Sequence, residues 1–207
     1  MRQTALSILL AMTCLGFGAS VSAESNTKPA AAADLTNRAA LLSFTCAGCH
    51  GMDGASVGPA SPTIAGLSPD TFTEAMQQFK KGERPSTIMG RIAKGYSDEE
   101  IELMAEYFSK QTFVPAKQEA NTELVNKGKE LHENYCAKCH EDGGTKDIDG
   151  SSILAGQWKP YLEMTLADFY SKEREAGKKM AAKLEDLQKD HGDDGVKALI
   201  EYYSSQQ

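Results

Sequence analysis

The sequence has little that would hold this protein in a membrane or bind it to a polyanion. No long apolar run follows the first 23 of its 207 residues, so we expect no membrane-spanning helix in the mature chain. Acidic residues outnumber basic ones, 29 to 22, which argues against nucleic acid or an anionic membrane surface as a partner. No convincing alternation of apolar and polar residues predicts a β-strand. The sequence therefore favours an all-α fold.

The N-terminus has the pattern of an export signal. Arg2 supplies the positive region, residues 5–17 are mostly apolar but too short to span a bilayer, and Val21-Ser22-Ala23 offers small residues for cleavage. A retained anchor is the alternative. We expect residues 1–23 to be removed and the mature protein to lie in the periplasm. Removing these residues would also remove Cys14, one of the five cysteines, and would leave a mature chain with a net charge of −8.

Two Cys-x-x-Cys-His motifs account for the four remaining cysteines. They consist of Cys46, Cys49 and His50 and, 90 residues later, Cys136, Cys139 and His140. Residues i and i+3 share a helix face, so both sulfurs can reach the two vinyl groups of one porphyrin while the histidine binds its iron. The motifs predict two covalently bound haem c groups, with no disulfide and no free thiol. A zinc site is the alternative, but it requires four converging ligands and leaves both histidines unexplained.

The internal repeat also predicts the sixth ligand of each iron. Met89 follows His50 by 39 residues, and Met180 follows His140 by 40. Methionine thioether is a common partner of histidine in cytochromes c. The other candidates are Met52, Met76 and Met104 in the first half and Met164 in the second. Bis-histidine ligation is the alternative, but the two spare histidines, His132 and His191, both fall in the second half.

The repeat divides the chain into two tandem cytochrome c-like domains, each enclosing one haem. We expect the first at residues 24–115 and the second at residues 116–207. Each half closes with an apolar stripe of helical spacing, formed by Ile101, Met104, Ala105 and Phe108 and then by Val196, Leu199, Ile200 and Tyr203. We expect the second closing helix to begin near Asp193, after a polar loop at residues 188–192.

Basic residues gather around both methionines. Residues 80–94 carry a net charge of +4 and residues 172–183 a net charge of +3. Such a surround either steers an acidic redox partner to a haem edge or keeps a solvated loop soluble. The single tryptophan, Trp158, is expected to pack on the second haem, to bind one of its propionates, or to fill the core.

The chain resembles the dihaem cytochrome subunit of flavocytochrome c sulfide dehydrogenase. The similar stretches are CAGCHGMDGASVGPASPTIAG (46–66), STIMGRIAKGYS (86–97), QTFVPAKQ (111–118), SSILAGQWKPYL (151–162) and KKMAAKL (178–184). The resemblance implies a subunit that is not an enzyme by itself. It would accept electrons from an FAD-containing, sulfide-oxidising flavoprotein and pass them to another cytochrome, with FAD only in the partner. It also assigns Cys46, Cys49, Cys136 and Cys139 to the thioether bonds and His50, Met89, His140 and Met180 to iron.

Two other functions remain open from the sequence. One is a free-standing periplasmic dihaem carrier that delivers electrons to a terminal oxidase. The other is a haem enzyme such as a peroxidase, which needs an open iron position and is disfavoured by the two methionines.

Two finer expectations concern the histidines and the docking side. Cytochromes c often orient the ligand histidine with a proline carbonyl. Gly58-Pro59 is suited to this in the first half, whereas no proline lies between His140 and Trp158 in the second. We expect the flavoprotein to dock on the first half, where Arg84, Arg91 and Lys94 frame the haem edge.

Overall fold

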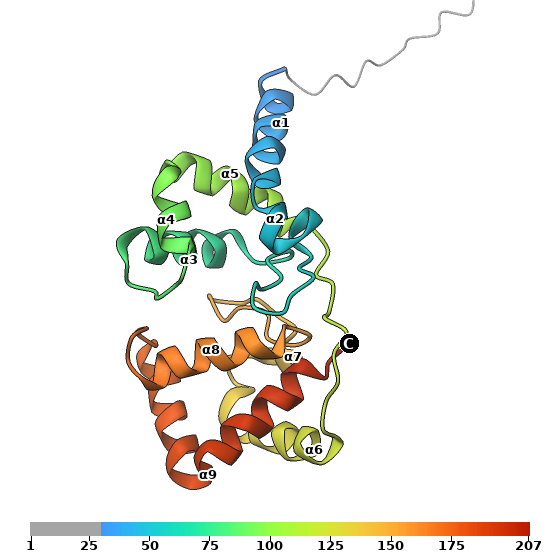
Figure 1. Ribbon diagram of the computed structural model, residues 1–207, viewed down its shortest axis with the longest axis vertical. Coiled ribbons are helices and arrows are strands. Elements are labelled where there is room, and N and C mark those ends of the chain that lie inside the picture. Colours follow the sequence, from blue (N-terminus) through green and yellow to red (C-terminus); the bar gives the residue numbers. More distant parts are fainter. Residues whose placement is uncertain (1–29) are drawn as a thin grey trace, which may run out of the picture.

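The computed structural model describes residues 30–207, with side chains from residue 34, so the predicted export signal lies outside the described residues. Two helical halves lie one above the other, joined by residues 111–121, which have no regular structure (Figure 1). The first half contains α1 (Ala30–Phe44), α2 (Ala47–His50), η1 (Met52–Gly54), α3 (Pro69–Lys81), α4 (Met89–Ile92), η2 (Ala93–Gly95) and α5 (Asp98–Ser109). The second contains α6 (Thr122–Leu131), the π-helix η3 (His132–Cys136), α7 (Glu141–Gly144), α8 (Lys159–Tyr170) and α9 (Lys178–Ser204). Residues 30–207 include no strand, which confirms the predicted all-α class.

Local sequence signals fix the ends of the main helices in the first half. Helix α5 begins with a capping box, in which the Ser97 side chain accepts from the Glu100 amide and the Glu100 side chain accepts from the Ser97 amide. Helix α3 follows Ser68, whose side chain accepts from the amide of Thr71, and ends at Gly82 in the left-handed conformation. Between these caps, α3 and α5 pack against each other.

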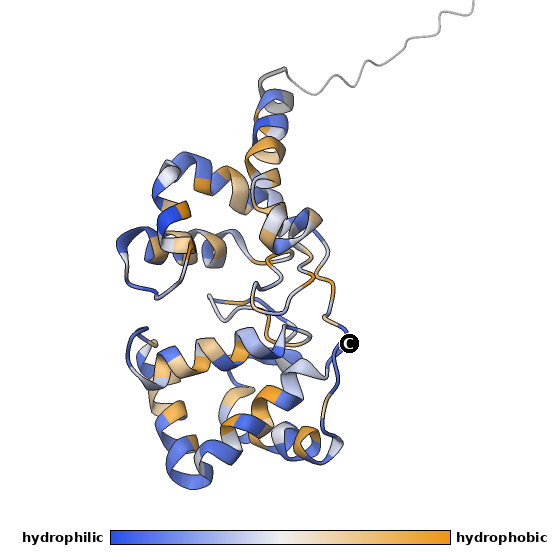
Figure 2. Ribbon diagram, in the orientation of Figure 1, coloured by the Kyte–Doolittle hydropathy of each residue, from blue (hydrophilic) through white to orange (hydrophobic). Residues whose placement is uncertain are grey.

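Each half has its own apolar core. The first is built from Phe72, Met76, Ile101, Met104 and Phe108, where α5 packs against α1 and α3. The second is built from Leu131, Leu162, Leu187, Leu199 and Tyr203, where α9 packs against α6 and α8. Orange apolar segments of the helices alternate with blue polar ones in both halves (Figure 2). The two closing stripes predicted from the sequence therefore lie in separate cores.

One predicted loop is a helix. Helix α9 runs from Lys178 through His191 without a loop, and its only non-helical residue is Gly192, with φ 58° and ψ −156°. Residues 178–191 contain no glycine or proline and many strong helix formers, and Leu187 is buried in the core. The closing helix therefore begins at Lys178 instead of near Asp193, and only the break at Gly192 marks the predicted start. The polar character of residues 188–192 led to the prediction of a loop, but a half-exposed helix also needs a polar face.

The loops that follow the two motifs pack together between the halves. The Thr63 amide donates to the side-chain oxygen of Gln157 at 2.9 Å, and the Gln157 side-chain amide donates to the Thr63 carbonyl at 3.0 Å. Asp147 accepts from the Ser68 amide and the Thr71 hydroxyl, each at 2.7 Å. The second half thus holds the N-terminal end of α3 in the first half.

Trp158 lies at the interface between the two halves. Its indole N–H donates to the Ser56 carbonyl at 3.2 Å. Gly58 has φ +63°, and a Cβ there would lie 2.3 Å from the Trp158 ring. This contact across the domain boundary was not expected from the sequence. Because the indole N–H is already used there, it does not serve to bind a propionate.

Candidate haem attachment sites

The first motif forms one helical turn directly after α1. The amides of Cys49 and His50 both donate to the Cys46 carbonyl, at 3.2 and 2.9 Å. Cys46 is half-buried, Cys49 is exposed, and both are free thiols. Burial raises the pKa of the Cys46 thiol. The turn therefore presents two unpaired sulfurs of i, i+3 spacing on one helix face, as thioether attachment requires.

The second motif forms the same turn but is approached differently. The amides of Cys139 and His140 donate to the Cys136 carbonyl at 3.1 and 2.9 Å. The preceding residues, His132–Cys136, form a π-helix, which adds one residue to the turn before the motif. Burial raises the pKa of the Cys136 thiol. The sequence gave no sign of this insertion.

His132 is a packing residue at the start of this π-helix. It is fully buried, its Nδ1 lies 2.9 Å from the Tyr203 hydroxyl, and its ring contacts those of Tyr202 and Tyr203. His191 is exposed and contacts Tyr135. Neither His132 nor His191 belongs to a motif turn, and each contacts a tyrosine instead. They are therefore not held in the way that His50 and His140 are.

A proline carbonyl orients His50, but it is not the one predicted. Nδ1 of His50 lies 2.8 Å from the Pro62 carbonyl and must donate to it, which leaves Nε2 for a metal. Burial lowers the pKa of His50 and so favours the neutral ring that a metal needs, while the Pro62 contact opposes this shift. The expectation for Pro59 is wrong, because Pro59 is exposed on the outside of the loop.

His140 lacks the corresponding bond. Its Nδ1 is buried and has no hydrogen-bond partner among the described residues. Burial, followed by the nearby His132, lowers the pKa of His140, and the nearby Ser151 backbone opposes this shift. Ser152 occupies the position equivalent to Pro62 and has φ +56°. The Ser151 backbone is thus the nearest group to the acceptor expected to replace proline in the second half.

The same backbone cradle follows both motifs. The Gly54 carbonyl accepts from the amides of Ile64 and Ala65, and the Gly144 carbonyl accepts from those of Leu154 and Ala155. Both glycines have positive φ, and a Cβ on either would lie within 3.0 Å of its neighbours. The loop beyond each motif therefore folds back in the same way in both halves.

The six methionines weighed as ligands differ in burial. Met76 and Met104 are buried in the first core, whereas Met52 and Met164 are exposed. Met89 opens α4 and Met180 lies in the first turn of α9, and both are half-buried. Met89 packs against the same core as Cys46. Two half-buried thioethers at repeat-related positions fit the predicted pattern.

This donor set fits haem better than zinc. Residues 34–207 bring no three histidine, cysteine or acidic side chains together as a metal site, so the paired cysteines do not converge on one ion. Each motif instead offers two free thiols and one oriented or buried imidazole. These groups would hold a porphyrin through two thioether bonds, with the histidine as an iron ligand.

A family model described as cytochrome C oxidase, cbb3-type, subunit III matches the chain twice, at residues 33–108 and at residues 123–202. The chain belongs to this cytochrome c family. Each match lies in one structural half, which confirms two tandem cytochrome c domains, and membership implies covalently bound haem c and a role in electron transfer. Within the described residues, no helix is long and apolar enough to cross a bilayer.

Three individual proteins are similar to this chain in sequence or structure. The cytochrome subunit of sulfide dehydrogenase from Chlorobaculum tepidum is 52% identical over 81 residues, which are 39% of this chain and 73% of that protein. Cytochrome c4 from Azotobacter vinelandii is 29% identical over 142 residues, covering 60% of this chain and 67% of the relative. The crystal structure of reduced cytochrome c4 from Pseudomonas stutzeri has a TM-score of 0.69 at 24% identity, covering 85% of this chain and 98% of that one. The predicted resemblance to the sulfide dehydrogenase cytochrome subunit is confirmed.

Proposed function

We propose that this cytochrome carries two haems. Cys46 and Cys49 would bind the first porphyrin and Cys136 and Cys139 the second, with His50 and Met89 and then His140 and Met180 as iron ligands. The bound haems would supply one-electron redox chemistry. The free thiols, the repeated motif turn and the two half-buried methionines support this assignment.

The ligand assignment is tested by replacing each methionine separately. Met89→Ala and Met180→Ala should each remove half of the weak near-infrared absorption that arises from methionine-to-iron charge transfer. Met52→Ala, an exposed methionine in the first half, serves as the matched control and should leave the band unchanged. A band that survives either of the first two replacements would show that the sixth ligand is elsewhere.

We further propose that the protein accepts electrons from an FAD-containing, sulfide-oxidising flavoprotein in the periplasm and passes them to another cytochrome. The single observation that carries this is the 52% identity to a sulfide dehydrogenase cytochrome subunit. The chemistry agrees, because a reduced flavin holds two electrons and each haem iron accepts one. With all four mature cysteines bound to haem, the chain would keep no thiol for sulfide chemistry. It would then not be an enzyme by itself.

The partner is tested with the haem-loaded chain, purified from its native host under gentle conditions. A flavin-bearing chain should co-purify, and sulfide should reduce the haems only in its presence. Equal reduction by sulfide with and without that chain would refute the assignment. A free-standing dihaem carrier is the second candidate, favoured by the similarity to cytochrome c4 over 60% of this chain. It predicts that no flavoprotein co-purifies.

We expect the flavoprotein to dock on the first half, with one revision to the residues involved. Arg91 and Lys94 are exposed beside Met89, but Arg84 turns towards the second half, where it donates to the Tyr161 hydroxyl at 2.8 Å. Charge reversal of Arg91 and Lys94 together should weaken flavoprotein binding. Reversal of Lys178 and Lys179 is the matched control, and loss of binding only in that variant would place the docking site on the second half.

A further inference from the structure

Two arginines occupy the same position in the two domains. The Arg84 guanidinium lies over the Phe79 ring at 4.7 Å, and the Arg174 guanidinium lies over the Phe169 ring at 4.4 Å. Both the arginines and the phenylalanines are 90 residues apart, the offset that also separates Cys46 from Cys136. The internal repeat therefore preserves an arginine stacked on an aromatic ring, ahead of the proposed methionine ligand in each half.

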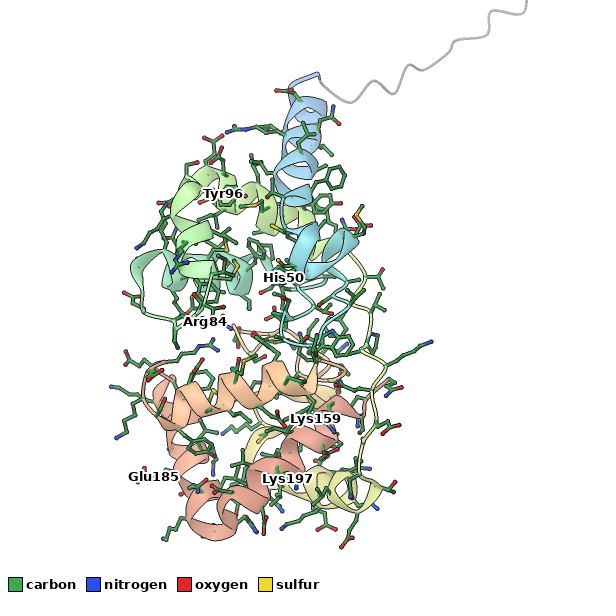
Figure 3. All side chains as sticks on the ribbon, in the orientation of Figure 1. His50, Arg84, Tyr96, Lys159, Glu185 and Lys197 are labelled. Carbon is green, nitrogen blue, oxygen red and sulfur yellow. The ribbon has the colours of Figure 1, made fainter. Side chains whose placement is uncertain are left out.

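These arginines lie near each other at the domain boundary. Arg84 lies on the side of the first half that faces the second (Figure 3), and its Nη2 donates to the hydroxyl of Tyr161 in α8 at 2.8 Å. Burial, and then the neighbouring Arg84, lower the pKa of Arg174 to about 10. Burial alone would raise the pKa of Tyr161, but Arg84 and Arg174 are among the groups that lower it. One environment thus holds two cations and a phenol.

The positive charge of this cluster has no direct ion-pair partner among residues 34–207. Asp168 and Glu74 are near enough to favour the charged form of Arg174 but do not contact it. Two partly buried cations side by side are unfavourable unless an anion lies between them. The planar fork of a guanidinium matches a carboxylate, and the Tyr161 hydroxyl can add a further donor.

We propose that Arg84, Tyr161 and Arg174 form an interdomain anion site that takes propionate carboxylates of the haems. The inference rests on the haem attachment proposed above but not on the flavoprotein. Each haem carries two carboxylates, and Arg84 and Arg174 precede Met89 and Met180 by five and six residues. Ferric haem is more positive than ferrous haem, so cations at this site disfavour the ferric state and raise the reduction potentials. Because both domains contribute, the site links the potentials of the two haems.

The test is a redox titration of the isolated, haem-loaded chain. Arg84→Gln and Arg174→Gln should each lower the ferrous-to-ferric ratio at a fixed potential by about tenfold, equivalent to about 59 mV for a one-electron couple. Arg91→Gln removes the same charge from an exposed position near Met89 and is the matched control. Shifts no larger than that of Arg91→Gln would overturn the proposal.

Two further measurements keep the result interpretable. Arg84→Lys and Arg174→Lys keep the charge, so the fold is less disturbed, and should shift the potentials in the same direction by less. Wild-type potentials in these variants would overturn a site that depends on the guanidinium fork. A solution anion is the other source of negative charge. Wild-type potentials that fall in phosphate relative to chloride at equal ionic strength would show a free anion at the site and refute propionate binding. Absence of a flavoprotein partner would leave all these outcomes unchanged.

Discussion

Gln157 gives the sharpest test of how the two domains hold each other. Its side chain comes from the second half, is 3% exposed, and bonds both the amide and the carbonyl of Thr63, which is 1% exposed. Thr63 directly follows Pro62, whose carbonyl orients His50. The change Gln157→Ala therefore removes the contact that holds the backbone beside a proposed iron ligand of the other domain.

The expected loss follows from what is left unbonded. Each hydrogen bond contributes about 1 kcal/mol, and a buried donor or acceptor left without a partner costs about 1–3 kcal/mol. Gln157→Ala leaves the backbone amide and carbonyl of Thr63 unpaired in a buried interface, and water will relieve part of this cost. We therefore expect the free energy of unfolding to fall by about 2–5 kcal/mol. The loss should appear first as uncoupling of the two domains.

The assay is urea unfolding of the haem-loaded protein, followed by far-ultraviolet circular dichroism and by haem absorbance. The control is Gln77→Ala, which removes one exposed hydrogen bond to Asp98 and should change stability by less than about 0.5 kcal/mol. The variant at position 157 should also separate the transitions of the two probes. A loss below about 1 kcal/mol, with coincident transitions, would refute the view that this contact couples the domains.

Three further predictions address the thiols, the helix crossing and an acidic group. Denatured mature protein should contain four thioether bonds and no thiol titratable by a thiol reagent; one free thiol would contradict the site assignment. Gly128→Ala places a Cβ 2.0 Å from the Ala198 carbonyl oxygen. This overpacking should cost at least about 1–3 kcal/mol and lower the melting temperature. The control Gly95→Ala, whose Cβ meets nothing within 4 Å, should leave the melting temperature unchanged. Burial raises the pKa of Glu201, but hydrogen bonds from Lys159 and the Asn121 amide lower it by more, so the pKa in the folded protein lies below the ordinary value of 4.5. The charged carboxylate therefore stabilises the fold at pH values above 4.5, and this stabilisation is lost as the pH falls through the folded pKa. Glu201→Gln should therefore be less stable than wild type at pH 7 and lose less stability on acidification; an unchanged pH profile in urea titrations would contradict this.

Much of the molecule follows from local sequence. The two Cys-x-x-Cys-His motifs form the same helical turn wherever they occur, because a turn is set by neighbouring residues. The stripe from Ile101 to Phe108 and the capping box at Ser97 place α5 and its buried face correctly. The repeat of 90 residues predicts two similar domains, because similar numbers of residues separate the motif from the closing apolar helix in each half.

The tertiary structure decided which distant groups meet. It selected Pro62 instead of Pro59 for His50, left Nδ1 of His140 without a partner, and turned Trp158 and Arg84 into interface residues. None of these contacts lies within one helical turn, so no local periodicity encodes it. The offset of 90 residues between Arg84 and Arg174 was visible in the sequence, but that they lie near each other depends on how one domain sits on the other. Packing between the halves, which lowers the free energy only once both have folded, fixed that arrangement.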